Sequence, residues 1–465
     1  MTDKSGVNIP LGTAVPLGTT VPRVLFGTDG VRDVANRGSM TPEMALRLGR
    51  AFVLFLAERG VQRPRIVTGR DTRRSGTMLD CAIASGMASA GAEVTQVGVL
   101  PTPGVSFAVL RTGADGGAVV SASHNPAEYN GIKFIDGDGR KLSDEAEARV
   151  EELLGDDLAD EWRPTGACVG EVKAGDEAEC YAARLASIAD WRRDWRLLFD
   201  CANGAASGVM QSMAARLGAD WAFTGVEPDG MNINEGVGVM NIGHLCRMAA
   251  EGGFDAGFAF DGDADRALMA DSSGRVIDGD MEIWILARWL ARRGALGSGV
   301  VVTMMSNSAL DERLRLDGIE VFRCPVGDRY VLGEMMRRGA RLGGEQSGHI
   351  IIDSLARTGD GICTAMCVLT ACRDMGEDIG TLADRFARFP QRLSSLPTSG
   401  RALNLDEIRA AAAEAERMVE GRGRIFIRPS GTEPLLRVLV EAADDALADE
   451  ASALLMAALG ERLRL

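Results

Sequence analysis

Three stretches of the sequence repeat one order of features: an apolar strand, a short polar turn, an amphipathic helix and a glycine before a second apolar strand. The strand, turn and helix fall at 65–89, 196–217 and 300–316, and the closing glycines are Gly91, Gly218 and Gly318. Glycine often ends a helix because it adopts the left-handed conformation without strain. Strand–helix–strand units of this length indicate parallel strands in an α/β sheet. The repeat therefore predicts three similar α/β domains in tandem.

The C-terminal part of the sequence departs from this repeat. It offers a charged, Ala-rich helix at 402–420, strands at 424–427 and 435–441, and a terminal helix. Two strands flanked by helices predict a smaller α+β module. The stretch 390–400 is rich in Ser, Pro and Arg, so we expect it to be the linker that precedes this module.

Charge and hydropathy exclude two classes of partner. Lys and Arg number 51 against 66 Asp and Glu, which gives a formal net charge of −15. No run of basic residues offsets this charge, so we do not expect the chain to bind nucleic acid. No apolar run reaches the roughly 18 residues that would indicate a membrane span. Residues 1–22 lack the uninterrupted apolar core of a signal peptide, and we expect them to form a flexible tail.

The cysteines argue against a structural zinc site. Nine cysteines are scattered without a Cys-x-x-Cys pair, and the three histidines lie far from most of them. Structural zinc needs clustered thiolates or imidazoles. Cys363 and Cys367 have the i, i+4 spacing of one helix face, where two buried small side chains are the simpler interpretation. The odd number of cysteines in a large chain indicates reduced thiols and a cytoplasmic location.

The first candidate site is the loop 121–126, Ser-Ala-Ser-His-Asn-Pro, which follows an apolar run. A hydrolase triad is not supported, because the Gly-x-Ser-x-Gly elbow is absent and His124 is adjacent in sequence to Ser123. In extended backbone that histidine would point away from the serine. A serine that carries a phosphoryl group is the alternative, and 129–133 would supply a turn and then a cation, Lys133. A simple turn capped by Ser and Asn remains open.

The second candidate site is the loop 261–266, where Asp261, Asp263 and Asp265 alternate along the chain and Arg266 follows. Carboxylates at i, i+2 and i+4 face one point on an extended segment. Each like-charge pair at about 4 Å costs ~4 kcal/mol at an effective dielectric near 20, so either water or a cation must separate them. The Gly and Glu of an EF-hand loop are missing. Three oxygen ligands with open positions suit Mg²⁺, whereas a solvated loop is the alternative.

The third candidate site is the Gly-rich loop 343–349 between two apolar strands. Glycine permits close approach of the backbone, while Glu345, Ser347 and His349 offer hydrogen bonds suited to sugar hydroxyl groups. His349 is also a candidate for proton transfer. A polar hairpin turn would be the simpler interpretation if this loop stood alone.

The fourth candidate site is the loop 428–434, Arg-Pro-Ser-Gly-Thr-Glu-Pro. Arg428 offers a forked guanidinium to phosphate, and Ser430, Gly431 and Thr432 offer hydroxyl groups and consecutive backbone N–H groups. It is not a Walker loop, because the Gly-Lys-Ser/Thr ending is missing. A plain turn remains open. Each of the four loops falls between strands of a different predicted domain, and four such loops in one chain are far less expected by accident than one.

These four loops, in this order, resemble the signature of the phosphohexomutase superfamily. The resemblance runs from Leu-Phe-Gly-Thr-Asp-Gly-Val-Arg at 25–32 to about residue 440. Within the superfamily, the motifs 344–349 and 326–330 are similar to the phosphoglucosamine mutase branch. The phosphomannomutase/phosphoglucomutase branch more often has Met at the position of Gln346. The sequence departs from the pattern at Asp33, where the family commonly has Gly.

The resemblance implies four domains around a central cleft. Three would be similar α/β domains with mixed sheets, and the fourth a smaller C-terminal α+β domain. The boundaries that we predict are a tail at 1–22 and domains at 23–170, 171–278, 279–390 and 391–465. These domains would carry the phosphoserine loop, the metal loop, the sugar loop and the phosphate loop in that order.

The resemblance also implies roles for the residues of these loops. Ser123 would be phosphorylated in the active enzyme, and one Mg²⁺ per active site would be bound by Asp261, Asp263, Asp265 and an oxygen of the phosphorylated Ser123. The implied catalytic residues are Ser123, His124, Lys133, Arg266 and His349, with the general base left open among His124, Lys133 and His349. The implied substrate-binding residues are Arg32, Asp328, Arg329, Glu345, Ser347, Arg428, Ser430, Gly431 and Thr432.

The implied activity is the interconversion of glucosamine 6-phosphate and glucosamine 1-phosphate through a 1,6-bisphosphate, which would supply UDP-N-acetylglucosamine synthesis. A hexosamine or hexose 1,6-bisphosphate would act as intermediate and activator. The alternative within the superfamily is a phosphomannomutase/phosphoglucomutase with the same mechanism. A Mg²⁺ phosphatase and a non-catalytic sugar-phosphate sensor are the alternatives outside it. We expect a small sugar phosphate as partner, and a monomer or homodimer.

Overall fold

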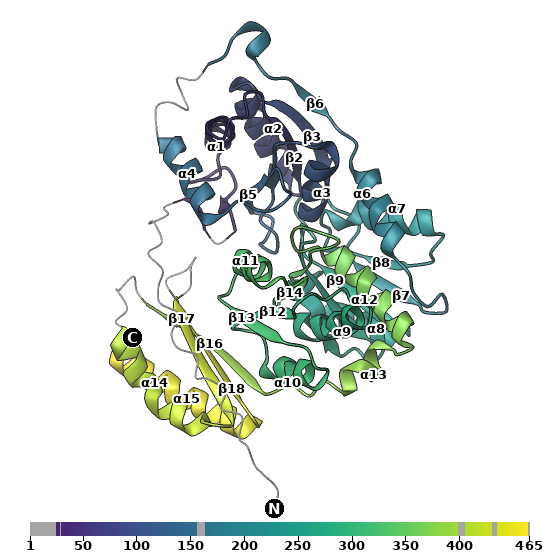
Figure 1. The fold of residues 1–465 in the computed structure, drawn as a ribbon, viewed down its shortest axis with the longest axis vertical. Coiled ribbons are helices and arrows are strands. Elements are labelled where there is room, and N and C mark those ends of the chain that lie inside the picture. Colours follow the sequence, from purple (N-terminus) through teal and green to yellow (C-terminus); the bar gives the residue numbers. More distant parts are fainter. Residues whose placement is uncertain (1–24, 28, 156–162, 399–404, 430–434, 464–465) are drawn as a thin grey trace, which may run out of the picture. The chain divides into compact units, whose positions relative to one another are not determined.

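The computed structural model describes residues 25–27, 29–155, 163–398, 405–429 and 435–463, which form two compact units (Figure 1). The large unit comprises the described residues of 21–303 and 314–385. The small unit comprises 304–313 and the described residues of 386–465. The predicted tail at 1–22 lies outside the described residues.

The first sheet of the large unit has the strand order β1-β5-β4-β2-β3-β6. Its strands are β1 (Val31–Val34), β2 (Arg65–Arg70), β3 (Glu93–Val99), β4 (Gly116–Val120), β5 (Tyr129–Asp136) and β6 (Val172–Ala174), and its helices are α1 (Pro42–Glu58), α2 (Arg74–Ser89), α3 (Thr102–Thr112) and α4 (Asp144–Gly155). Strand β5 runs antiparallel to β1 and β4, whereas β2 runs parallel to β3 and β4. The predicted turn at 129–133 is therefore wrong, because these residues begin β5.

Strand β5 is buried along most of its length, and its register sets which residues face the core. It pairs with β4 so that Val119 lies opposite Lys133. The neighbouring residues Ile132 and Phe134 belong to the apolar core of this sheet, where the Phe134 ring stacks on Phe52 at 4.4 Å between centroids. Since successive side chains of a strand point to opposite faces, Lys133 faces away from this core.

The second sheet has the order β11-β10-β9-β7-β8. Its strands are β7 (Leu197–Asp200), β8 (Ala222–Thr224), β9 (Ala256–Phe260), β10 (Ala267–Asp271) and β11 (Val276–Ile277), and the helices of this region are α6 (Ala178–Ile188), α7 (Ala206–Leu217) and α8 (Ile242–Gly252). Strand β7 runs parallel to β8 and β9, and β10 runs antiparallel to β9. Short 3₁₀ turns lie at Gly166–Cys168 and Val239–Asn241.

The third sheet has the order β13-β12-β14-β15. Its strands are β12 (Val300–Thr303), β13 (Val321–Cys324), β14 (Leu342–Gly344) and β15 (Ile350–Ile352), and the helices of this region are α9 (Gly279–Arg292), α11 (Asp328–Arg338), α12 (Gly361–Met375) and α13 (Ile379–Asp384). Helix α10 (Ser308–Leu316) follows β12 in the sequence, and its residues 308–313 belong to the small unit. Strand β12 runs parallel to β13 and β14, and β15 runs antiparallel to β14.

The predicted repeat is confirmed in all three sheets. Each predicted strand–helix–strand unit is a parallel pair, namely β2 with β3, β7 with β8 and β12 with β13. Gly218 ends α7 in the left-handed conformation at φ 57°, as the helix-stop pattern predicts. The repeat is therefore structural rather than chance alternation.

The small unit holds a three-stranded antiparallel sheet of order β16-β18-β17, with α14 and α15 packed against it. Its elements are β16 (Gln391–Pro397), α14 (Leu405–Val419), β17 (Gly423–Pro429), β18 (Leu435–Ala442) and α15 (Asp445–Leu463). The prediction of a linker at 390–400 is wrong, because most of this stretch is β16. The Ser and Pro residues suggested a linker, but an edge strand such as β16 can have Pro at its end.

The fold class predicted from the sequence is confirmed: three α/β regions with mixed sheets and a smaller C-terminal domain. Strand β6 lies beyond residue 170 and pairs with β3 of the first sheet. The predicted domain boundaries, and a central cleft between the four domains, stay predictions.

All nine cysteines are free, and Cys363 and Cys367 are buried in α12 as predicted. Among the described residues, no helix is both long and apolar enough to cross a membrane.

One buried side chain of the large unit, that of Glu282, bears on the stability of the fold. Neither oxygen of Glu282, on α9, has a hydrogen-bond partner among the described residues, and burial raises the pKa of Glu282 well above its usual value.

We predict that Glu282→Met raises the free energy of unfolding near neutral pH by about 1–3 kcal/mol, because it removes a buried polar group with no partner. The raised folded-state pKa means that protonated Glu282 favours the folded state, so wild-type stability falls as the pH rises through this pKa. The gain should therefore shrink toward pH 4, as measured by denaturant unfolding across a pH series. Glu282→Gln, which never ionises, is the control for the pH dependence. A Glu282→Met variant less stable than wild type at pH 7 would contradict the prediction.

Candidate functional site

The loop that follows β4 presents Ser123 to the second sheet of the large unit. Ser123 is 1% exposed, and its backbone has φ 52°, a left-handed conformation that is uncommon for a residue other than glycine. Its hydroxyl group donates a 2.5 Å hydrogen bond to Asp261 Oδ2. The ring Nδ1 of His124 lies 3.4 Å from Ser123 Oγ. The serine and the first aspartate of the predicted metal loop are therefore in direct contact.

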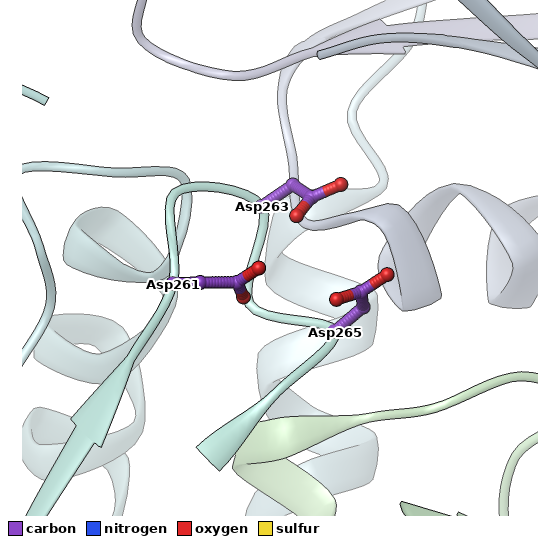
Figure 2. A group of neighbouring side chains, drawn as sticks. All are labelled: Asp261, Asp263 and Asp265. Carbon is purple, nitrogen blue, oxygen red and sulfur yellow. The ribbon is translucent and has the colours of Figure 1, made fainter. Parts of the chain in front are cut away.

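The three aspartates converge in the loop between β9 and β10 (Figure 2). Asp261, Asp263 and Asp265 are all buried, and one oxygen of each lies within 4.8 Å of the others. The turn that gathers them passes through Ala264 at φ 55°. Burial, followed by the charges of Asp265 and Asp263, raises the pKa of Asp261 well above its usual value. The solvated-loop alternative is therefore wrong.

Lys133 supplies positive charge to this loop from the middle of β5. Its Nζ lies 2.9 Å from Asp263 Oδ2 and 2.9 Å from Asp29 Oδ2. Burial lowers the pKa of Lys133, but the charges of Asp263 and Asp29 outweigh burial and leave the pKa raised. Burial raises the pKa of Asp263, but the charge of Lys133 outweighs burial and leaves this pKa below its usual value.

The carboxylate cluster fits a divalent metal ion. Oδ1 of Asp263 and Oδ1 of Asp265 are buried and have no hydrogen-bond partner among the described residues. A buried carboxylate oxygen without a donor is costly, and a cation would satisfy both oxygens at once. An all-oxygen donor set of carboxylates is the type that Mg²⁺ and Ca²⁺ prefer.

A second lysine, Lys141, joins the first sheet to α11 of the third region. Its Nζ lies 2.8 Å from Asp29 Oδ1 and 2.5 Å from Asp328 Oδ2. Burial lowers the pKa of Lys141, but Asp29 and Asp328 leave it well above its usual value. A cavity of about 290 Å³ lies on this side of the site, and Lys141 and Asp328 are among its lining residues.

His349, at the end of the loop 343–349, lies close to two carboxylates of the site, Asp265 and Asp328. Its Nδ1 is 3.6 Å from Asp265 Oδ2, and its Nε2 is 3.8 Å from Asp328 Oδ2. Burial lowers the pKa of His349, but these two carboxylates leave it raised. In the same loop, Glu345 Oε1 accepts a 3.0 Å hydrogen bond from the backbone N–H of Gly327.

Two arginines of the site, Arg32 and Arg266, lie close to His124. Arg32, on β1, forms an ion pair with Asp29, and Arg266 Nε lies 3.8 Å from Asp265 Oδ1. Burial, followed by the charges of Arg266 and Arg32, lowers the pKa of His124 to about 4. This histidine is therefore neutral at physiological pH.

The structure brings most of the predicted site residues together in the large unit. Arg329 forms ion pairs with Asp144 and Glu147 of α4. Ser347 Oγ has one weak contact, 3.5 Å from Glu345 Oε2. Arg428 lies on β17 of the small unit, opposite Arg437, whereas Ser430, Gly431 and Thr432 lie outside the described residues.

Sequence reasoning missed several residues of this site. Asp29 and Lys141 complete the charge network, and Asp71, Arg73 and Asn234 contact the Ser123 loop or the residues next to it. A signal existed for two of them. Asp29 belongs to the motif at 25–32, and Asp71 lies in the short polar turn that follows a predicted strand. Lys141 and Asn234 had no such local signal, because their partners are distant in the sequence.

The sequence matches four domain descriptions of one family. They are the phosphoglucomutase/phosphomannomutase α/β/α domains I, II and III and the C-terminal domain, over residues 23–159, 179–274, 278–389 and 394–457. Among curated relatives, the phosphoglucosamine mutase of Pelotomaculum thermopropionicum is 46% identical over 423 residues, which is 90% of this chain and 95% of the relative. That of Rubrobacter xylanophilus is 47% identical over 427 residues, which is 90% of this chain and 93% of the relative.

Solved structures share the fold. A phosphoglucomutase/phosphomannomutase family protein from Burkholderia thailandensis has a TM-score of 0.80 at 24% identity, covering 94% of this chain and 97% of that one. The N-acetylphosphoglucosamine mutase of Aspergillus fumigatus, solved with GlcNAc-6P and magnesium, has a TM-score of 0.67 at 18% identity, covering 94% and 96%. The four matched domains and the relatives together show that this chain belongs to the phosphoglucomutase/phosphomannomutase family of phosphohexomutases.

Proposed function

We propose that this chain is a phosphoglucosamine mutase that interconverts glucosamine 6-phosphate and glucosamine 1-phosphate. The observation that supports this most is the 2.5 Å contact between Ser123 Oγ and Asp261, at the edge of a buried carboxylate cluster. A serine beside a divalent-cation site is suited to carry a phosphoryl group. The preference for the amino sugar rests on the relatives, which are named phosphoglucosamine mutases.

One Mg²⁺ would be held by Asp261, Asp263 and Asp265, with an oxygen of phosphorylated Ser123 as a further ligand. When bound, the ion would neutralise negative charge on the transferring phosphoryl group. Lys133 and Arg266 would add fixed positive charge from two sides. Phosphoryl transfer depends mainly on such positioning and electrostatic stabilisation.

The reaction would run in two balanced steps. In the first, the bond between phosphorus and Ser123 Oγ breaks, and phosphorus bonds to O1 of glucosamine 6-phosphate. The proton that O1 loses would pass to Ser123 Oγ by way of His124, whose Nδ1 lies 3.4 Å from that oxygen. In the second step the bisphosphate, after turning over, returns its O6 phosphoryl group to Ser123, and a proton passes from Oγ to O6. A hexosamine or hexose 1,6-bisphosphate would prime the unphosphorylated enzyme as activator.

The remaining predicted residues would bind the substrate. The phosphate that does not react would lie on Arg428, Ser430, Gly431 and Thr432. The sugar hydroxyl groups would contact Glu345 and Ser347, with His349 close to the reacting groups, and Arg32, Asp328 and Arg329 would border the site. Arg329 can bind substrate only after leaving Asp144 and Glu147, its partners in this structure. A cytoplasmic location and a monomeric or dimeric state belong to the same proposal.

We predict that Ser123→Ala abolishes turnover while the fold is kept, because the residue that carries the phosphoryl group is lost. Turnover is measured with a coupled assay of sugar 1-phosphate, and folding by circular dichroism and thermal melting. Ser85→Ala is the matched control, since Ser85 is exposed on α2 and bonds only the carbonyl of Cys81 among the described residues. Activity of Ser123→Ala close to that of wild type would rule out the mechanism.

We predict that ³¹P NMR of the Mg²⁺-loaded protein with glucosamine 6-phosphate and a trace of a hexose 1,6-bisphosphate will show a growing sugar 1-phosphate resonance without inorganic phosphate. Inorganic phosphate alone would indicate a phosphatase. Conversion of mannose or glucose 6-phosphate in place of glucosamine 6-phosphate would keep the mutase mechanism and overturn the substrate assignment.

We predict that Asp265→Asn weakens Mg²⁺ binding at least 10-fold and lowers turnover, because it removes one charge from the donor set. Affinity is measured by calorimetry on the unphosphorylated protein, so that the result does not depend on activity. Asp138→Asn is the control, because Asp138 is half exposed and pairs with Arg140. Unchanged Mg²⁺ affinity in Asp265→Asn would place the metal ion elsewhere.

A further inference from the structure

The backbone carbonyl groups of the Ser123 loop accept hydrogen bonds from two side chains, those of Arg73 and Asn234. These hydrogen bonds do not involve the three aspartates of the carboxylate cluster. Ser123 has a left-handed backbone at φ 52°, which an L-residue keeps only when its surroundings hold it there. The bonds that do so come from one arginine and one amide side chain. Both residues lie in the large unit, and neither was predicted from the sequence.

Arg73, just before α2, is buried with its side chain 0% exposed. Its Nε donates to Asp71 Oδ2 at 2.9 Å, and its two terminal nitrogens donate to the carbonyl oxygens of four residues of the loop and the start of β5: Ser123 at 3.0 Å, Asn125 at 2.7 Å, Tyr129 at 3.1 Å, and Pro126. A guanidinium group presents its donors in a fixed plane and is always charged. One side chain therefore fixes the direction of the whole turn.

Asn234 binds the same loop from the second α/β region. Its Nδ2 donates to the carbonyl oxygen of Ser123 at 3.0 Å and to that of Asn125 at 3.1 Å. Gly262 of the aspartate loop approaches so closely that a Cβ atom there would lie 2.6 Å from the carbonyl oxygen of Ser123. The serine loop is thus pressed against the aspartate loop with its carbonyl oxygens bound on both sides.

The backbone N–H group of Ser123 is also linked to Arg73, through a chain of hydrogen bonds. The backbone N–H of Ser123 donates to Ser121 Oγ at 2.9 Å, and Ser121 Oγ donates to Asp71 Oδ2 at 2.7 Å. Asp71 Oδ2 is also the atom that accepts from Arg73 Nε. Arg73 therefore holds the backbone of Ser123 directly through the carbonyl group and indirectly through Asp71 and Ser121.

We propose that Arg73 and Asn234 are positioning residues for phosphoryl transfer: they hold the Ser123 backbone so that Oγ faces Asp261 in both half-reactions. This inference rests on the proposed mutase function and deepens it. The serine must donate a phosphoryl group and later recover one at the same point, so a loop that drifts loses both steps. Displacement of a reacting group by about 1 Å costs on the order of 100-fold in rate.

The test compares Arg73→Lys, Asn234→Ala and the double variant with wild type in the steady-state mutase assay. Lysine keeps the charge but cannot reach four carbonyl groups and Asp71 together. We expect kcat to fall roughly 10- to 100-fold in each single variant, with KM within about threefold of wild type. Mg²⁺ affinity of the unphosphorylated protein should stay within about threefold, because the three aspartates lie on a different loop. The ³¹P resonance of the phosphoserine should shift or broaden.

The matched control is Arg47→Lys, because Arg47 also donates to a backbone carbonyl, that of Leu154, but on the α1 side of the first sheet. It should leave kcat unchanged. Unchanged kcat in both Arg73→Lys and Asn234→Ala would overturn the inference. A fall in kcat accompanied by a similar fold-loss of Mg²⁺ affinity and by a lower melting temperature would also overturn it, because it would indicate a purely structural role. If Arg73→Lys does not fold, Asn234→Ala decides alone. A wild-type protein without mutase activity would instead refute the proposed function itself.

Discussion

The buried contact of Lys133 with Asp263 and Asp29 is the interaction on which the site depends. Three aspartates on one loop repel one another, by about 4 kcal/mol for a pair at 4 Å and an effective dielectric near 20. Lys133 and Lys141 offset part of this repulsion, and both come from the first α/β region, whereas the aspartates belong to the second. Charge neutralisation therefore joins the two regions at the site. Two oxygens of the cluster, Asp263 Oδ1 and Asp265 Oδ1, still have no hydrogen-bond partner among the described residues, which fits the binding of a cation.

The Ser123 loop is held through its own backbone groups rather than through hydrogen bonds to the three aspartates. Its carbonyl oxygens accept from Arg73 and Asn234, while its hydroxyl group alone faces Asp261. This division separates two tasks. One set of bonds fixes the position of the serine, and another set provides the electrostatic environment of its oxygen.

The sequence predicted the fold and the site loops better than it predicted the residues that contact those loops from distant parts of the chain. The strand–helix–glycine repeat and the aspartate spacing are local, so they predicted the three sheets and the clustering of the three aspartates. Lys141 and Asn234 act across more than 100 residues of sequence, and no local pattern marks such pairs. The errors at 129–133 and 390–400 share one cause: Gly, Asn, Ser and Pro suggested turns where pairing with a neighbouring strand decides the structure.

The antiparallel pairing of β4 and β5 has a further consequence. Both strands flank the serine loop, and Lys133 lies opposite Val119 with Ile132 and Phe134 facing the aromatic core. A strand that slips by one residue exchanges its two faces. Such a slip would place the ammonium group beside Phe52 and a phenyl ring beside the aspartates. An insertion between β4 and β5 that shifted this register by one residue would therefore exchange the two faces of β5 and separate Lys133 from the aspartates.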